Sequence, residues 1–191
     1  LSTAAKARRA AGCVTDGLVR DVRQIRAMDF PVFHGGIGPL DTKGRARMVD
    51  VTPKEPTHRR AVARCKVFMQ PATTAAVANR EVKKGDVLAV ARVAGIQAAK
   101  RTSDMIPLCH PLLIGAVTIN FEIGDTWVAV ECHVDTIDRT GVEMEALHAC
   151  SVAALTIYDM CKSADREMVI GELTLWEKSG GRQGTYRRTA P

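Results

Sequence analysis

Aromatic side chains are scarce in this sequence of 191 residues, since Phe, Tyr and Trp together make up 4% of it. Proteins that bind single-stranded nucleic acid stack successive bases on such side chains. The composition therefore disfavours a nucleic-acid partner that is bound by stacking.

The sequence also lacks an apolar run of the roughly 20 residues that cross a bilayer. No apolar secretory segment stands near its beginning. We therefore expect no membrane partner and a cytoplasmic location.

Six cysteines are present, but none forms a Cys-x-x-Cys pair. This spacing predicts neither a zinc ribbon nor a dithiol redox motif. Because the cysteines lie mostly within apolar runs, we expect small buried side chains in a reducing compartment.

What is present suits one compact domain with a tail. Apolar residues make up 46% and charged residues 25%, the net charge is +6, and the pI is about 9.2. A basic excess is typical of proteins that meet nucleic acid, an anionic membrane or a phosphorylated small molecule, and composition does not choose among them.

The first part of the chain differs from the rest. Residues 12–17 predict a short strand, and residues 18–28 predict a helix because Leu18, Val22 and Ile25 have helical spacing. A second short strand is predicted at 31–33, followed by a Gly-, Lys- and Arg-rich linker at 35–47.

From Cys65 onward the apolar pattern is regular. It predicts strands at 65–70, 113–121, 127–137 and 168–176, helices at 71–79, 85–100 and 142–162, and a mobile Gly-rich end at 178–181. The order of these elements indicates an α+β protein of ferredoxin-like fold, with an antiparallel sheet and its helices packed on one face.

Two polar clusters border the predicted helix at 85–100. Lys84 belongs to Lys83-Lys84-Gly85-Asp86, which is typical of a turn with Asp86 capping the next helix. Lys100 ends that helix, where a cation suits the negative pole of the dipole.

His110 stands between Cys109 and Pro111 in an apolar loop. It is either structural or held rigidly for acid–base catalysis. Cys109 and His110 alone do not supply a tetrahedral ligand set, so no metal site is predicted.

Glu143 has a structural explanation at the start of the long helix. Thr140 and Glu143 match a capping box. Glu145 lies about 200° further round the helix than Glu143, so the two carboxylates do not share one face.

Asp159 and Lys162 lie three residues apart at the far end of the same helix and face the same way. They form either a weak surface ion pair or a carboxylate that tunes an amine for proton transfer. Because Asp159 follows the apolar run 152–158, we expect the pair at a buried edge. The residues thus predict Lys, Arg and His side chains converging on a polyanionic small molecule.

Several strings, in order and with matching spacing, resemble the cyclic pyranopterin monophosphate synthase family from about residue 48 to residue 186. They are Met48–Val51, Lys84–Val87, Ala94–Thr102, Ile106–Leu112, Thr140–Leu147, Ala154–Lys162 and Lys178–Gly181. Long strings in combination are far more specific than a single short motif.

The resemblance implies a lyase that acts on 3′,8-cyclo-7,8-dihydroguanosine triphosphate, releases diphosphate and needs no cofactor. It implies a homohexamer built as a trimer of dimers, with the active site at the dimer interface. The catalytic positions fall on Lys84, His110, Asp159 and Lys162. The substrate-binding positions fall on Arg59, Lys100, Leu108, Cys109, His110, Glu143, Met144, Glu145 and Lys178.

Two departures from the family pattern concern binding geometry. Arg182 and Gln183 stand where Lys and Ser are usual, and Arg139 stands where Lys is commoner. Positive charge is kept near the site.

Residues 1–47 form an extension that resembles a different family, the ribonuclease E activity regulators and 4-hydroxy-4-methyl-2-oxoglutarate aldolases. Arg20 and Asp21 match a pair that binds substrate and metal in the aldolases. Only a fragment of such a domain is present, too short to bury its own core, so we expect no aldolase activity. The synthase-like domain is predicted at 48–191.

A basic nucleotide- or RNA-binding module of ferredoxin-like fold is the alternative that charge and fold permit. Its central strands normally carry paired aromatic residues for base stacking, which are missing here. An inactive homologue acting as an assembly partner would be expected to lack Asp159 or Lys162, and both are present.

Overall fold

The computed structural model describes residues 13–19, 32–37 and 46–189. The chain divides into two compact units, Leu1–Asp50 and Val51–Pro191. In the first unit, strands β1 (Cys13–Val19) and β2 (Val32–Ile37) pair in parallel.

These strands cover most of the strands predicted at 12–17 and 31–33. The helix predicted to begin at Leu18 is wrong at its start, because Leu18 belongs to β1. The rest of that helix and most of the predicted linker lie outside the described residues, as do Arg20 and Asp21.

The second unit is an antiparallel sheet with strand order β4-β5-β3-β6-β7. Its elements in chain order are β3 (Thr57–Phe68), α3 (Pro71–Ala78), α4 (Val87–Lys100), α5 (Thr102–Met105), β4 (Ile114–Ile123), β5 (Trp127–Asp138), α6 (Glu143–Cys161), β6 (Val169–Ser179) and β7 (Tyr186–Arg187). The predicted α+β class, the antiparallel sheet and the β4–β5 hairpin are confirmed, whereas α5 and β7 were missed.

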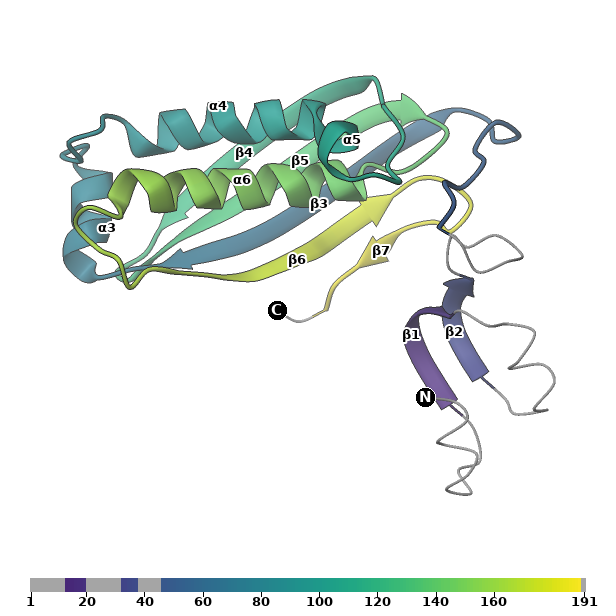
Figure 1. The fold of residues 1–191 in the computed structure, drawn as a ribbon, viewed down its shortest axis with the longest axis horizontal. Helices are drawn as coiled ribbons and strands as arrows, with labels where there is room; N and C mark the ends of the chain where they lie inside the picture. Colours follow the sequence, from purple (N-terminus) through teal and green to yellow (C-terminus); the bar gives the residue numbers. More distant parts are fainter. Residues whose placement is uncertain (1–12, 20–31, 38–45, 190–191) are drawn as a thin grey trace. The chain divides into compact units, whose positions relative to one another are not determined.

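Helices α4 and α6 lie side by side over one face of the sheet, with α3 and α5 near opposite ends of this layer (Figure 1). The central strand β3 begins at Thr57, well before the predicted start at Cys65. The part of β3 before Cys65 carries Arg60 and Arg64, charges that a sequence pattern does not assign to a central strand. Arg64 is accommodated because its guanidinium pairs with Glu131 and lies 4.2 Å from the centre of the Trp176 ring.

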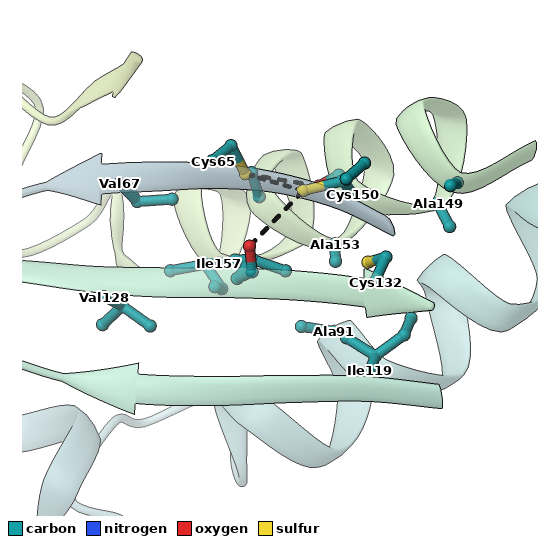
Figure 2. Packing of buried hydrophobic residues seen from close by; sticks show 14 of the residues in the cluster. Cys65, Val67, Ala91, Ile119, Val128, Cys132, Ala149, Cys150, Ala153 and Ile157 are labelled. Carbon is teal, nitrogen blue, oxygen red and sulfur yellow. Dashed lines mark hydrogen bonds between the residues drawn. The ribbon is translucent and has the colours of Figure 1, made fainter. Parts of the chain in front are cut away.

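The core lies between the sheet and the two long helices. Alternate residues of β5, from Val128 to Val134, are completely buried, as the period-two pattern predicts. Figure 2 shows Cys65 of β3 facing Cys150 of α6 within this layer, with their sulfur atoms 3.2 Å apart. The hydrogen bond from Cys150, together with burial, raises the pKa of the Cys65 thiol far above its usual range, so the thiol behaves as a small apolar core group.

The 3.6-residue spacing in α6 predicts one apolar side through Met144, Leu147, Ser151, Ala154, Leu155, Tyr158 and Cys161. This is correct for Ala154 and Cys161, which are buried, and wrong for Met144 and Leu155, which are 39% and 57% exposed. Ala146, Ala149 and Ala153 are buried as well. The reason is the close approach of α4: a Cβ on Gly95 would lie 2.9 Å from the Ala149 carbonyl oxygen and 3.3 Å from the Ala153 Cβ. Small side chains on both helices allow this contact.

Gly95→Ala tests this packing. The added methyl would meet Ile119 Cδ1 as well as the Ala149 backbone, and overpacking of this kind costs about 1–3 kcal/mol. We expect that loss in the free energy of unfolding, measured by urea denaturation, although Ala favours a helix more than Gly does. The control is Gln97→Ala at an exposed position of α4; a Gly95→Ala protein as stable as this control would contradict the packing argument.

Candidate active site

Three charged side chains meet where α6 ends. Lys84 Nζ donates hydrogen bonds to the Asp159 carbonyl oxygen and to Asp159 Oδ2, both at 2.8 Å. Lys162 Nζ lies 2.7 Å from the other carboxylate oxygen, Oδ1. Each oxygen of one carboxylate therefore holds one ammonium group, and the cluster carries a net positive charge.

The two lysines keep Asp159 ionised. Hydrogen bonds from Lys162 first and Lys84 second lower the pKa of Asp159 to about 2. The predicted buried edge is wrong, because the Asp159 and Lys162 side chains are 55% and 53% exposed. Exposure suits a group that must meet a ligand arriving from solvent.

The turn before α4 brings Lys84 to this cluster. The Gly85 amide donates to the Val82 carbonyl oxygen, and Gly85 adopts a φ of +104° that favours glycine. Asp86 then caps α4 by accepting a hydrogen bond from the Ala89 amide at 3.0 Å. The predicted cap is confirmed, and it fixes the direction in which the turn presents Lys84.

A second group of charged residues lines a cavity of about 730 Å³ beside the start of α6. Its cations are Lys54, Arg59, Lys178 and Arg182, and its carboxylates are Glu55 and Glu143. Sequence reasoning missed Lys54 and Glu55, because a Lys-Glu-Pro loop before a strand has no feature that separates it from an ordinary surface loop. Cations predominate in this cavity, which favours anionic ligands.

Arg59 of β3 contacts the backbone at the end of β5. Its Nε donates to the Asp138 carbonyl oxygen at 3.2 Å, and its Nη2 donates to the Arg139 carbonyl oxygen at 3.1 Å. These bonds hold the guanidinium against the end of β5 and use two of its five N–H groups.

Glu143 is not part of a capping box. The N-cap of α6 is Val142, with no side-chain cap hydrogen bond, so the predicted role of Thr140 and Glu143 is wrong. The Glu143 carboxylate lies instead against Gly141, where a Cβ would come within 1.9 Å of its Oε2. Because it does not cap the helix, the Glu143 carboxylate lines the cavity.

Glu145 points the other way and is buried, with 4% of its surface exposed. Burial, with a smaller contribution from the charge of Glu143, raises the pKa of Glu145 to about 7 against the opposing effect of a backbone hydrogen bond. Burial and the charge of Glu145 also raise the pKa of the Cys109 thiol. A carboxyl that titrates near neutrality is able to give or take a proton at physiological pH.

The remaining predicted positions flank this end of the fold. Lys100 is exposed in the last turn of α4, and Met144 is partly exposed in the first turn of α6. In the loop after α5, Leu108 is 40% exposed, and Cys109 and His110 are partly buried. No hydrogen bond, ion pair or cavity among the described residues joins His110 or Lys100 to the cavity beside α6.

The two groups lie at opposite ends of one helix. From Glu143 to Asp159, α6 rises about 24 Å at 1.5 Å per residue. The structure therefore brings Lys84, Asp159 and Lys162 together, and brings Arg59, Glu143 and Lys178 together, but one chain does not unite the two groups.

Within the residues that the structure describes, no cluster of three or more His, Cys, Asp or Glu side chains is arranged to hold a metal ion. None of the helices in those residues is both long enough and apolar enough to span a bilayer.

The raised pKa of the buried Glu145 predicts that the stability of the protein depends on pH. Its pKa is about 7 in the folded protein against an ordinary value of 4.5. Between these values the folded protein keeps the proton and the unfolded chain has released it, so stability falls as pH rises, by up to about 1.4 kcal/mol per pH unit. Glu145→Gln should remove this slope in urea titrations between pH 5 and 7.

The control is Glu81→Gln, at an exposed carboxylate, which should keep the wild-type slope. A Glu145→Gln protein whose stability changes with pH as the wild type does would show that Glu145 ionises normally in the fold.

The fold and the two cationic groups define a small α+β protein suited to a phosphorylated small molecule. The model of the MoaC family matches residues 48–181, and the chain belongs to that family. A protein of Thermomicrobium roseum named cyclic pyranopterin monophosphate synthase is 56% identical over 151 residues, covering 78% of this chain and 91% of that protein.

Other relatives with that name agree. The one from Roseiflexus sp. is 57% identical over 149 residues, covering 77% of this chain and 94% of the relative. The one from Heliobacterium modesticaldum is 56% identical over 151 residues, covering 78% and 95%. In addition, residues 1–89 match a model described as Aldolase/RraA, so the predicted resemblance of the extension to that family is confirmed.

Proposed function

We propose that this protein converts (8S)-3′,8-cyclo-7,8-dihydroguanosine 5′-triphosphate to cyclic pyranopterin monophosphate and diphosphate, in the biosynthesis of the molybdenum cofactor. It acts as a phosphorus–oxygen lyase. The observation that carries the proposal is the joined Lys84–Asp159–Lys162 cluster, in a chain 56% identical to a protein named for that reaction.

Lys162 is the proposed general acid, because forming the pterin moves protons onto and off ring nitrogen and oxygen atoms. Asp159 holds the Lys162 ammonium group at 2.7 Å and so fixes its direction. Lys84 shares the carboxylate from the other side. His110 is the further proposed proton-transfer group. Glu145, expected as a substrate-binding residue, is proposed to join it, because a pKa of about 7 suits proton transfer.

Closing the cyclic phosphate expels diphosphate, so negative charge develops on the leaving group. Preorganised cations lower the energy of such a charge because they need no reorganisation when it forms. Arg59, Lys100 and Lys178 are the proposed contacts, and Leu108, Cys109, Glu143 and Met144 are proposed to border the substrate. The excess of cations in the cavity with Arg59 and Lys178 supports this assignment.

We infer a homo-oligomer, a hexamer built as a trimer of dimers, whose active site forms where two subunits meet. The support is the separation of about 24 Å along α6, which keeps the two groups apart in one chain. In a two-fold dimer in which one group of each chain faces the other group of its partner, the contact occurs twice, so two complete sites arise per dimer.

The proposal also covers the fold, the domain boundary and the location of the protein. The strand order β4-β5-β3-β6 with crossings through α4 and α6 supports a ferredoxin-like assignment. We propose that residues 1–47 are an extension without aldolase activity and that residues 48–191 form the synthase domain. A substrate made from a nucleoside triphosphate is consistent with a cytoplasmic enzyme.

The RNA-binding alternative is disfavoured by the open face of the sheet. Trp127 and Trp176 line a cavity there, but Lys66 lies 5.3 Å and Arg64 lies 4.2 Å from the respective ring centres. Ion pairs with Glu172 and Glu131 hold these cations, so the indoles are engaged within the protein. A shift assay with single-stranded RNA at increasing salt tests for any such binding.

Replacement of Lys162 by Ala should abolish turnover, because the proposed acid is lost. The measurement is mass detection of the pterin product and diphosphate after incubation with the cyclised nucleotide. Lys83→Ala removes an exposed cation next to Lys84 and should keep wild-type activity. Retained turnover in a folded Lys162→Ala protein would remove Lys162 from the mechanism.

Mixing two inactive variants tests the shared site. Lys162→Ala and Lys178→Ala damage opposite ends of α6. After unfolding together and refolding in equal amounts, half of the dimers should be mixed and half of their sites intact, which restores about a quarter of wild-type activity. Lys162→Ala mixed with Lys84→Ala damages one end only and should restore none; equal results from both mixtures would refute the interface.

A further inference from the structure

The segment after β6 leaves the sheet directly over Arg59. Register pairs Arg60 with Ser179 at the last step of the β3–β6 ladder. The chain then turns through Gly180 and Gly181, with φ of +89° and +74°, both in the left-handed region that favours glycine. The Gly184 amide closes the turn by donating to the Gly181 carbonyl oxygen at 3.2 Å.

These glycines approach different neighbours. A Cβ on Gly180 would lie 2.1 Å from the His58 carbonyl oxygen, which is backbone inside the sheet and is unable to move away. A Cβ on Gly181 would lie 2.1 Å from Nη1 of Arg59, at the end of a flexible side chain. A side chain at position 181 therefore displaces the guanidinium, whereas one at position 180 disrupts the sheet.

Arg59 is thus held from two sides. The carbonyl oxygens of Asp138 and Arg139 bind its Nε and Nη2, and the bare backbone of Gly181 packs on its Nη1. The clash between a methyl group at position 181 and Arg59 is most easily relieved when the guanidinium moves away from those carbonyl oxygens. Because one of these hydrogen bonds is exposed and the other only partly buried, water replaces them when the guanidinium moves, and the main effect is a changed direction of the charge in the cavity.

We propose that Gly181 is a positioning residue: its missing side chain leaves the space in which Arg59 is aimed at an anionic ligand in the cavity lined by Lys178 and Arg182. This rests on the proposed function for the identity of the ligand, a diphosphate group. The experiment below measures inorganic diphosphate binding separately from turnover.

Gly184 provides the matched control. It has a φ of +65°, and a Cβ there would meet nothing within 4 Å. Gly184→Ala therefore reports the cost of a left-handed alanine alone, and Gly181→Ala adds the contact with Arg59. Both variants should unfold at similar temperatures, whereas Gly180→Ala should be markedly less stable.

Isothermal titration with inorganic diphosphate should show about tenfold weaker binding to Gly181→Ala than to Gly184→Ala, the size expected when a charged hydrogen-bond donor is misdirected. In an Arg59→Ala background the Gly181→Ala change should have no further effect, because the displaced group is gone. Additive losses in that cycle, or equal affinities of Gly181→Ala and Gly184→Ala, overturn the inference.

Turnover of the cyclised nucleotide is followed in parallel. Wild-type protein that makes the pterin while the two glycine variants bind diphosphate equally would refute only the positioning role. Wild-type protein that makes no pterin but shows the tenfold difference in diphosphate affinity would refute the proposed function and support the positioning role.

Discussion

The contact between α4 and α6 is the constraint on which the site depends. Gly95 lets the two helices approach until a single methyl would collide with the Ala149 backbone. Because α4 starts beside the end of α6, the turn before α4 delivers Lys84 to Asp159. At the opposite end, Thr102, just after α4, meets His148 of α6, which keeps the loop with His110 near the start of α6. A looser helix pair would leave both groups poorly aligned.

Each of the two charged groups has an excess of positive charge, which a bound polyanion would neutralise. Asp159 is shared by two ammonium groups, and the cavity beside α6 holds Lys54, Arg59, Lys178 and Arg182 against Glu55 and Glu143. Like charges held together repel one another, and an exposed carboxylate offsets this only in part. Binding of an anionic ligand relieves the repulsion, so the same arrangement that is costly in the free protein favours a polyanion.

Regular features were predictable from the sequence because they follow from one element at a time. The alternation through Val128 and Val134 and the Asp86 cap need no knowledge of the neighbouring chain. The buried side of α6 was predicted only in part, because the closeness of α4 selects alanines over larger apolar residues such as Met144 and Leu155. A charge on β3 such as Arg64 hid the start of a central strand, since its partners Glu131 and Trp176 come from distant parts of the sequence.

The proposed site residues come from the resemblance, and their geometry could not be predicted from it. Thr140 and Glu143 fit a capping box by spacing, yet the helix starts at Val142 and the carboxylate serves the cavity instead. Spacing also gave no reason to separate Lys162 from Lys178. Along α6, the rise from Glu143, which lines the cavity with Lys178, to Asp159, which binds Lys162, is about 24 Å, which is longer than any side chain can bridge. If the proposed reaction needs both groups, one chain does not supply them together, and the helix contact at Gly95 then helps to set how far apart they lie.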